Sequence, residues 1–79
     1  MRLDEVPVGK TVVVRSIADA RLRLEALRLG IAAGTVLQVT ARVPRGPVVV
    51  RGSSGPLALG REWARQVCVR PADILEDKP

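Results

Sequence analysis

Side chains that commonly perform chemistry are scarce in this sequence. The chain of 79 residues has no histidine and one cysteine, Cys68. The usual pairs of nucleophile and general base draw on histidine or cysteine, and sites for iron, zinc or copper draw on imidazole and thiolate ligands. The glycines of residues 52–60 lead into a strand, whereas a phosphate-binding loop leads into a helix. We therefore predict that the protein is not an enzyme and has no catalytic residues, no metal ligands and no cofactor.

Four further residues have side chains that could belong to a site. Glu25, Glu62 and the other acids are scattered along the chain, so a carboxylate-only metal site is the weaker alternative. Cys68 lies in an expected strand and is interpreted as a small apolar side chain. Trp63 is the only aromatic residue, and we expect it to close the open end of a barrel, because its large apolar area stabilises most when buried. The alternative for Trp63 is an exposed anchor for a partner.

The charge of the chain is basic and unevenly distributed. Thirteen Lys and Arg against eight Asp and Glu give a net charge of +5, and residues 1–70 carry twelve of the bases and five of the acids. This balance indicates an acidic partner, although a solvated arginine-rich surface has the same composition. A small basic β-barrel that binds nucleic acid is the alternative function. It is disfavoured because single-strand binders stack bases on several aromatic side chains.

The residue pattern predicts a mainly β domain. β-Branched or alternating apolar residues predict strands at 11–17, 36–43, 48–51, 56–60 and 66–70. In the second strand we expect four side chains to face the core: Leu37, Val39, Ala41 and Val43. A brief helical turn at 61–65 precedes the last strand. Five short strands at this spacing predict a small, partly open β-barrel with one short α-helix.

Residues 19–29 predict that helix. The segment has no β-branched residue, Asp19 is a good N-cap, and Gly30 suits the left-handed position that ends a helix. Gly34 then sets the turn into the next strand. Both glycines are therefore assigned structural roles, like Trp63.

The predicted helix has two apolar stripes on nearly opposite sides, at a step of about 100° per residue. A helix on a small barrel can bury only one of them. We expect one stripe to seat the helix: Leu24, Leu27 and Ile31. The other, with its flanking arginines, is predicted to bind a partner or a second copy of the chain: Leu22, Ala26, Leu29, Arg21 and Arg28. In the alternative, loops or the N-terminal residues Leu3 and Val6 cover this second stripe.

The two ends of the chain carry further expectations. We expect residues 1–70 to form a single domain and residues 71–79 an acidic tail, frayed unless Ile74 and Leu75 hold it down. The sequence has no apolar stretch of about 18 residues that could span a membrane. Its first residues lack the apolar centre of a signal peptide. We therefore expect a cytoplasmic protein that does not insert into a membrane.

The order of motifs along residues 26–69 resembles the FeoA family. The matching motifs are Leu29-Gly30-Ile31, Gly34, the alternating strand 37–43, the turn 44–47, the segment 57–59, the helical turn 61–65 and the valine strand 67–69. The resemblance implies an SH3-like barrel and an accessory protein of bacterial ferrous iron uptake. Such a protein binds or regulates the FeoB membrane permease at its cytoplasmic GTP-binding part. A stand-alone relative of the SH3-like domain of DtxR-type iron regulators is the other alternative.

Overall fold

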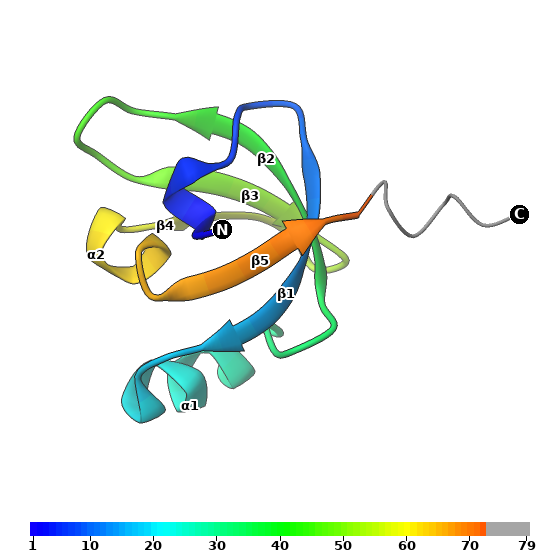
Figure 1. Cartoon of the computed structure of the whole chain (residues 1–79), viewed down its shortest axis with the longest axis vertical. Helices are drawn as coiled ribbons and strands as arrows, with labels where there is room; N and C mark the ends of the chain where they lie inside the picture. Colours follow the sequence, from blue (N-terminus) through cyan, green and yellow to red (C-terminus); the bar gives the residue numbers. More distant parts are fainter. Residues whose placement is uncertain (73–79) are drawn as a thin grey trace, which may run out of the picture.

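Over residues 1–72 the fold is a five-stranded antiparallel sheet with two helices and one 3₁₀ turn. The computed structural model describes residues 1–72. In chain order the elements are η1 (Leu3–Glu5), β1 (Thr11–Ile17), α1 (Ala20–Arg28), β2 (Val36–Arg42), β3 (Val48–Gly52), β4 (Gly55–Leu59), α2 (Arg61–Ala64) and β5 (Val67–Pro71). The strand order is β4-β3-β2-β1-β5, so β4 and β5 are the sheet edges. Figure 1 shows the sheet curled around one core, with α1 outside β1 and η1 close to α2.

The predicted fold class is confirmed. Five strands, one α-helix after the first strand and a helical turn before the last strand occur in the expected order. β1 has the predicted bounds, and the other four strands begin and end within one residue of them. β-Branched residues account for this agreement, because their side chains fit the pleated and half-buried surface of a strand.

Alternate strand residues form one apolar core. The largest fully buried strand side chains are Val12, Val14, Val39, Val50, Val67 and Val69. They come from β1, β2, β3 and β5, and Leu59 of β4 closes the same cluster. No polar or charged side chain within residues 1–72 is buried. The described core is therefore held by apolar packing.

The alternation expected for β2 is wrong in its second half. Leu37 and Val39 are buried as predicted, whereas Ala41 and Val43 are exposed. The pairing of β2 with β3 shifts register between Val39 and Ala41, which is a β-bulge. A bulge adds one residue to a strand, so every later side chain changes face.

The bulge gives Arg42 a structural role that the sequence pattern did not indicate. Arg42 pairs with the buried Val48 of β3, and its guanidinium turns toward the N-terminal segment. There Nη1 donates a hydrogen bond to the carbonyl of Val6 at 2.9 Å, and Nη2 donates to the carbonyl of Asp4. Arg42 therefore ties the first six residues to β2.

The N-terminal segment is a part of the barrel that periodicity did not predict. Leu3 in η1 and Val6 after it are both in the core. The backbone of this segment also pairs with β5. The N–H of Val69 donates to the carbonyl of Met1 at 2.7 Å, and Arg2 and Cys68 form an isolated antiparallel β-bridge. The segment thus covers the outer edge of β5. A 3₁₀ turn of three residues is too short to show a hydrophobic period.

Strand β5 runs slightly past the expected domain end. It continues through Pro71, one residue beyond the boundary predicted at residue 70. Ala72 is buried, and its N–H donates to the carbonyl of Thr11 at 3.0 Å. Ile74 and Leu75, which were predicted to hold the tail, lie outside the described residues.

Gly34→Ala is expected to destabilise the fold by about 1–2 kcal/mol. Gly34 has a φ of +94°, where a residue with a Cβ pays a conformational cost of this order. A Cβ at this position meets no heavy atom within 4 Å, so the loss is one of backbone conformation and not of space. Gly34→Asn is the matched control, because asparagine tolerates left-handed backbone. Urea denaturation measures both, and equal stability of Gly34→Ala and the wild type contradicts this account.

Candidate functional site

Helix α1 begins at the predicted N-cap. The Oδ1 atom of Asp19 accepts hydrogen bonds from the backbone N–H groups of Arg21 at 2.7 Å and Leu22 at 3.3 Å. These bonds satisfy two of the amide groups that lack partners at a helix start. Nη1 of Arg23 donates a further bond to the carbonyl of Ile17 at 2.9 Å. The first turn of α1 is thereby tied to the end of β1.

Helix α1 ends at the predicted glycine. Gly30 has a φ of +84°. Its N–H donates to the carbonyl of Leu27 at 3.1 Å, and the N–H of Ile31 donates to the carbonyl of Ala26 at 2.8 Å. These two bonds form a Schellman motif, in which the residue after the glycine folds back onto the last helical turn. Ile31 and Ala26 are accordingly buried in the same core.

The predicted seating of α1 is wrong for two of its three residues. Leu24 and Leu27 have exposed fractions of 59% and 61%, whereas Ala26 is fully buried and Leu22 packs against the core. The prediction placed Ile31 on the stripe of Leu24 and Leu27 by continuing the rotation of about 100° per residue beyond the helix. The left-handed backbone at Gly30 breaks that regular rotation, so Ile31 does not lie on their side. Ile31 is buried as predicted, on the side of Ala26. The apolar contact that accompanies a Schellman glycine is the sequence signal that indicates this seating.

The structure does not bring the predicted partner residues onto one surface. Ala26 lies inside the core and has no surface for a partner, and Leu22 is half-buried. Leu29 is 44% exposed and lines a hollow next to the turn between β3 and β4. Arg28 is exposed on the last turn of α1.

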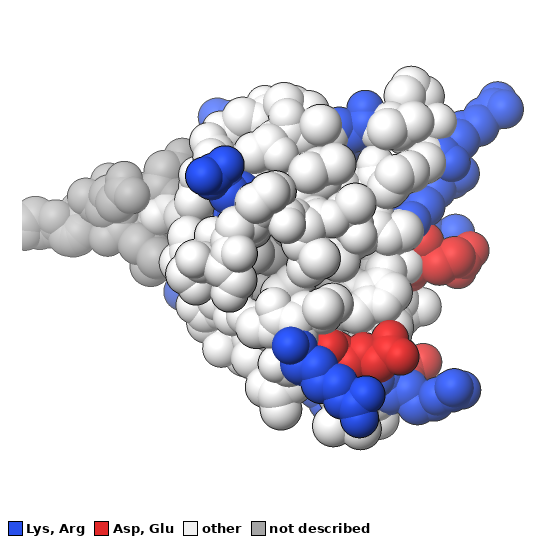
Figure 2. Space-filling view, turned by 180° about the vertical axis from the view of Figure 1, so that it is seen from behind, with Lys and Arg blue, Asp and Glu red and all other residues white. Residues whose placement is uncertain are grey.

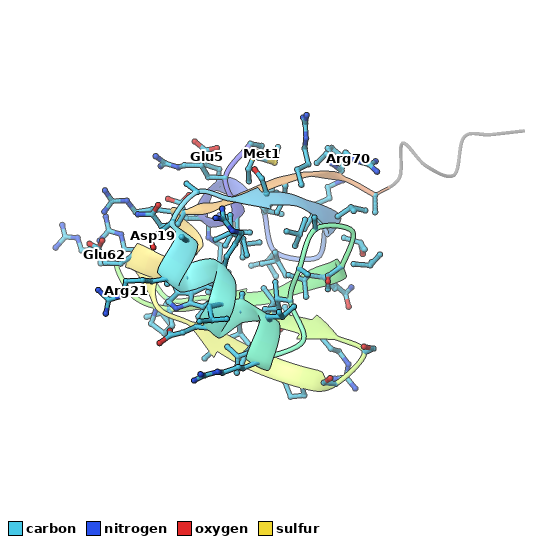
Figure 3. All side chains as sticks on the ribbon, turned by 90° about the horizontal axis from the view of Figure 1, so that it is seen from below. Met1, Glu5, Asp19, Arg21, Glu62 and Arg70 are labelled. Atoms are coloured by element: carbon cyan, nitrogen blue, oxygen red, sulfur yellow. The ribbon has the colours of Figure 1, made fainter. Side chains whose placement is uncertain are left out.

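Arg21 faces a different hollow, between α1 and α2. Figure 3 shows Asp19, Arg21 and Glu62 at the same end of the molecule. Trp63 of α2 lines this hollow too, and it is half-buried against the core. Trp63 is thus partly buried, and its expected role of closing the open end of the barrel stays a prediction. The hollow is lined by Asp19, Arg21, Leu22, Glu25, Glu62, Trp63 and Gln66.

A groove of about 450 Å³ runs between α1 and the end of β1. We call it the α1–β1 groove, and it is lined by Arg15, Ser16, Ile17, Ala20, Arg23, Leu24, Leu27, Ile31, Ala32 and Ala33. Most of these side chains are apolar, and the two exposed leucines, Leu24 and Leu27, stand one helical turn apart on its α1 wall. The groove is therefore the place where α1 presents exposed apolar surface.

The charges at the α1–β1 groove are of one sign. Its charged residues are Arg15 and Arg23, and neither forms an ion pair within residues 1–72. The acids nearest in sequence, Asp19 and Glu25, line the other hollow. Seen from behind, charged side chains lie mainly toward the edges of the molecule, and the centre of that face is uncharged (Figure 2). As far as residues 1–72 show, the groove thus combines an apolar floor with guanidinium groups that form no ion pair.

The described residues offer neither a metal site nor a membrane-spanning helix. Within residues 1–72, no three His, Cys, Asp or Glu side chains lie close enough together to hold a metal ion. The helices of the described residues are also too short and too polar to cross a membrane. Cys68 is a free thiol, half-buried in β5.

Solved structures with the same architecture include FeoA proteins. A FeoA protein from Chlorobium tepidum is 29% identical, with a TM-score of 0.80 over 90% of this chain and 70% of that one. FeoA from Stenotrophomonas maltophilia, solved with zinc and described as a procaryotic SH3 domain protein, is 26% identical, with a TM-score of 0.76 over 89% of both chains. These similarities confirm the SH3-like fold.

The fold also occurs in a regulator of transcription, whereas the family model identifies the FeoA domain. A manganese-dependent transcriptional repressor is also similar, with 27% identity and a TM-score of 0.82, over 90% of this chain and 41% of the repressor. Curated protein sequences show no significant match. The family model of the FeoA domain matches residues 1–71, nearly the whole of the described chain. The protein belongs to the FeoA family, whose members are non-enzymatic accessory proteins of iron transport.

Proposed function

We propose that this protein is a cytoplasmic accessory protein of bacterial ferrous iron uptake that binds a FeoB-type membrane permease at its GTP-binding part. The observation that carries the proposal is the match of the FeoA domain to residues 1–71. For the FeoA protein of Stenotrophomonas maltophilia, a role as a ferrous iron transport activating factor has been suggested. Residues 1–70 are the domain that acts in this role.

The described surface supports a role in binding. Two leucines of α1 are exposed: Leu24 and Leu27. Exposed apolar patches on small proteins commonly mark interaction sites. The residues available for chemistry are few, because the chain has no histidine and a single cysteine. A protein of this kind acts through contacts with a partner.

The similarity to the manganese-dependent repressor is consistent with a transport accessory protein. The chain spans 41% of that repressor, so most of the repressor has no counterpart in the match. FeoA proteins, in contrast, match this chain over most of their own length, up to 95%. We therefore favour a transport accessory protein over a regulator of transcription.

Binding to the permease is expected to depend only weakly on salt. With the purified chain and the purified GTP-binding part of FeoB from the same organism, isothermal titration calorimetry should detect a complex. Its Kd should change by about tenfold or less between about 50 and 200 mM salt. A nucleic-acid complex with 6–10 phosphate contacts loses affinity by roughly 10³–10⁵ over that range. Absence of a complex with the FeoB part contradicts the proposed function, and tight salt-sensitive binding to an oligonucleotide favours the alternative.

A further inference from the structure

We propose that the α1–β1 groove is the docking site for an amphipathic helical segment of the protein partner, with apolar side chains flanked by Asp or Glu. The inference rests on the proposed function, because it places the partner of that function on a defined surface. The groove replaces, as the proposed binding surface, the stripe of Leu22, Ala26 and Leu29 that the sequence predicted.

The floor of the groove favours an apolar occupant. Leu24 and Leu27 are more than half exposed, and Ile17 and Ile31 lie behind them at the base of the groove. Leucine is costly to leave in water, and two leucines one helical turn apart provide a contact strip of the kind used in helix-in-groove recognition. The free energy gained when an apolar segment covers both side chains provides the driving force for docking.

The backbone around the groove favours a helix over an added strand. Val14 of β1 already bonds to the loop before β2, since its N–H donates to Thr35 and its carbonyl accepts from Gly34. The carbonyl of Ile17, at the other end, accepts the bond from Arg23. The stretch between them is too short to pair with a strand of ordinary length. A helix satisfies its own backbone hydrogen bonds and needs no free edge.

The charge of the rim indicates acidic flanks on the occupant. Arg15 is exposed, and Arg23 is held in place by its single bond to Ile17 and retains further N–H donors. Guanidinium groups with free donors bind carboxylates well. A second copy of this chain, docked through the same surface around a twofold axis, brings the same arginines together and is disfavoured by their repulsion. Nucleic acid is disfavoured by the aliphatic floor, which has no aromatic face for a base.

The first test measures binding of groove variants to the purified GTP-binding part of FeoB. Combined Leu24→Ser and Leu27→Ser should weaken the complex by about tenfold or more, because the complex then no longer buries two leucine side chains. Leu29→Ser is the matched control, at the C-cap just after α1 and outside the groove lining, and should change the Kd by less than about twofold. Arg15→Glu should weaken binding by about fivefold, and Arg51→Glu, an exposed arginine on β3, should not. If the wild type binds and all of these variants bind with the same Kd, the groove is not the docking site, and the proposed function still holds.

The second test does not depend on the identity of the partner. A photo-crosslinking phenylalanine derivative is placed at position 24, or at position 29 as the control, in the full chain in bacterial cells. Adducts at position 24 are mapped by mass spectrometry. A segment with apolar residues at helical spacing and neighbouring acids supports the groove, even where it belongs to a protein other than FeoB and the proposed function fails. Adducts to a second copy or to nucleic acid, or no enrichment over position 29, overturn it.

Discussion

Ala26→Asp is expected to leave no folded protein. Ala26 is fully buried at the last turn of α1, and its carbonyl receives the Schellman bond from Ile31. A carboxylate at this position has no partner in the apolar core, and burying an unpaired charge costs several kcal/mol. Domains of this size have a total stability of only about 5 kcal/mol, so the variant should be unfolded.

Leu24→Asp is the matched control for this prediction. It places the same carboxylate on the same helix, two residues away and on an exposed side. The cost is that of helix propensity, about 0.5 kcal/mol. Two-dimensional amide NMR spectra should therefore be dispersed for Leu24→Asp and collapsed for Ala26→Asp. The opposite result, with Leu24→Asp unfolded, means that Leu24 packs against the barrel as the sequence predicted.

Leu3→Ala is expected to destabilise the protein by about 2–5 kcal/mol, as large-to-small substitutions in a packed core do. Leu3 is fully buried among the residues that close the barrel beside α2 and β5. Its segment also covers the edge of β5 through the bond from Val69 to Met1. Loosening the segment exposes that edge, and free strand edges promote association between chains. Urea denaturation should show the loss, and light scattering should show self-association at high concentration.

Val8→Ala provides the comparison for Leu3→Ala. Val8 lies in the same N-terminal region, and its side chain is 54% exposed. Its truncation should change the free energy of unfolding by no more than about 0.5 kcal/mol. A loss for Leu3→Ala as small as that for Val8→Ala shows that the N-terminal segment is not part of the cooperative core.

The amino-acid sequence by itself determined the elements of this protein. Runs of β-branched residues defined the strands, because their side chains favour extended backbone and a half-buried surface. Asp19 and Gly30 defined the two ends of α1, since each acts through hydrogen bonds and backbone angles within a few residues. The near absence of histidine and cysteine likewise gave a correct expectation of a family without enzymatic activity. These features are local or compositional, so the sequence contains them directly.

The tertiary structure alone decided which side of α1, and of the second half of β2, faces the core. The bulge after Val39 exposed Ala41 and Val43, and the turn at Gly30 placed Ala26 inside and Leu27 outside. A periodic pattern gives the spacing of apolar residues, but it loses its phase wherever a single residue departs from the regular backbone. The α1–β1 groove is likewise a product of the tertiary structure. Its residues come from β1, α1 and the loop after α1, and they meet only because packing sets the helix against the strand.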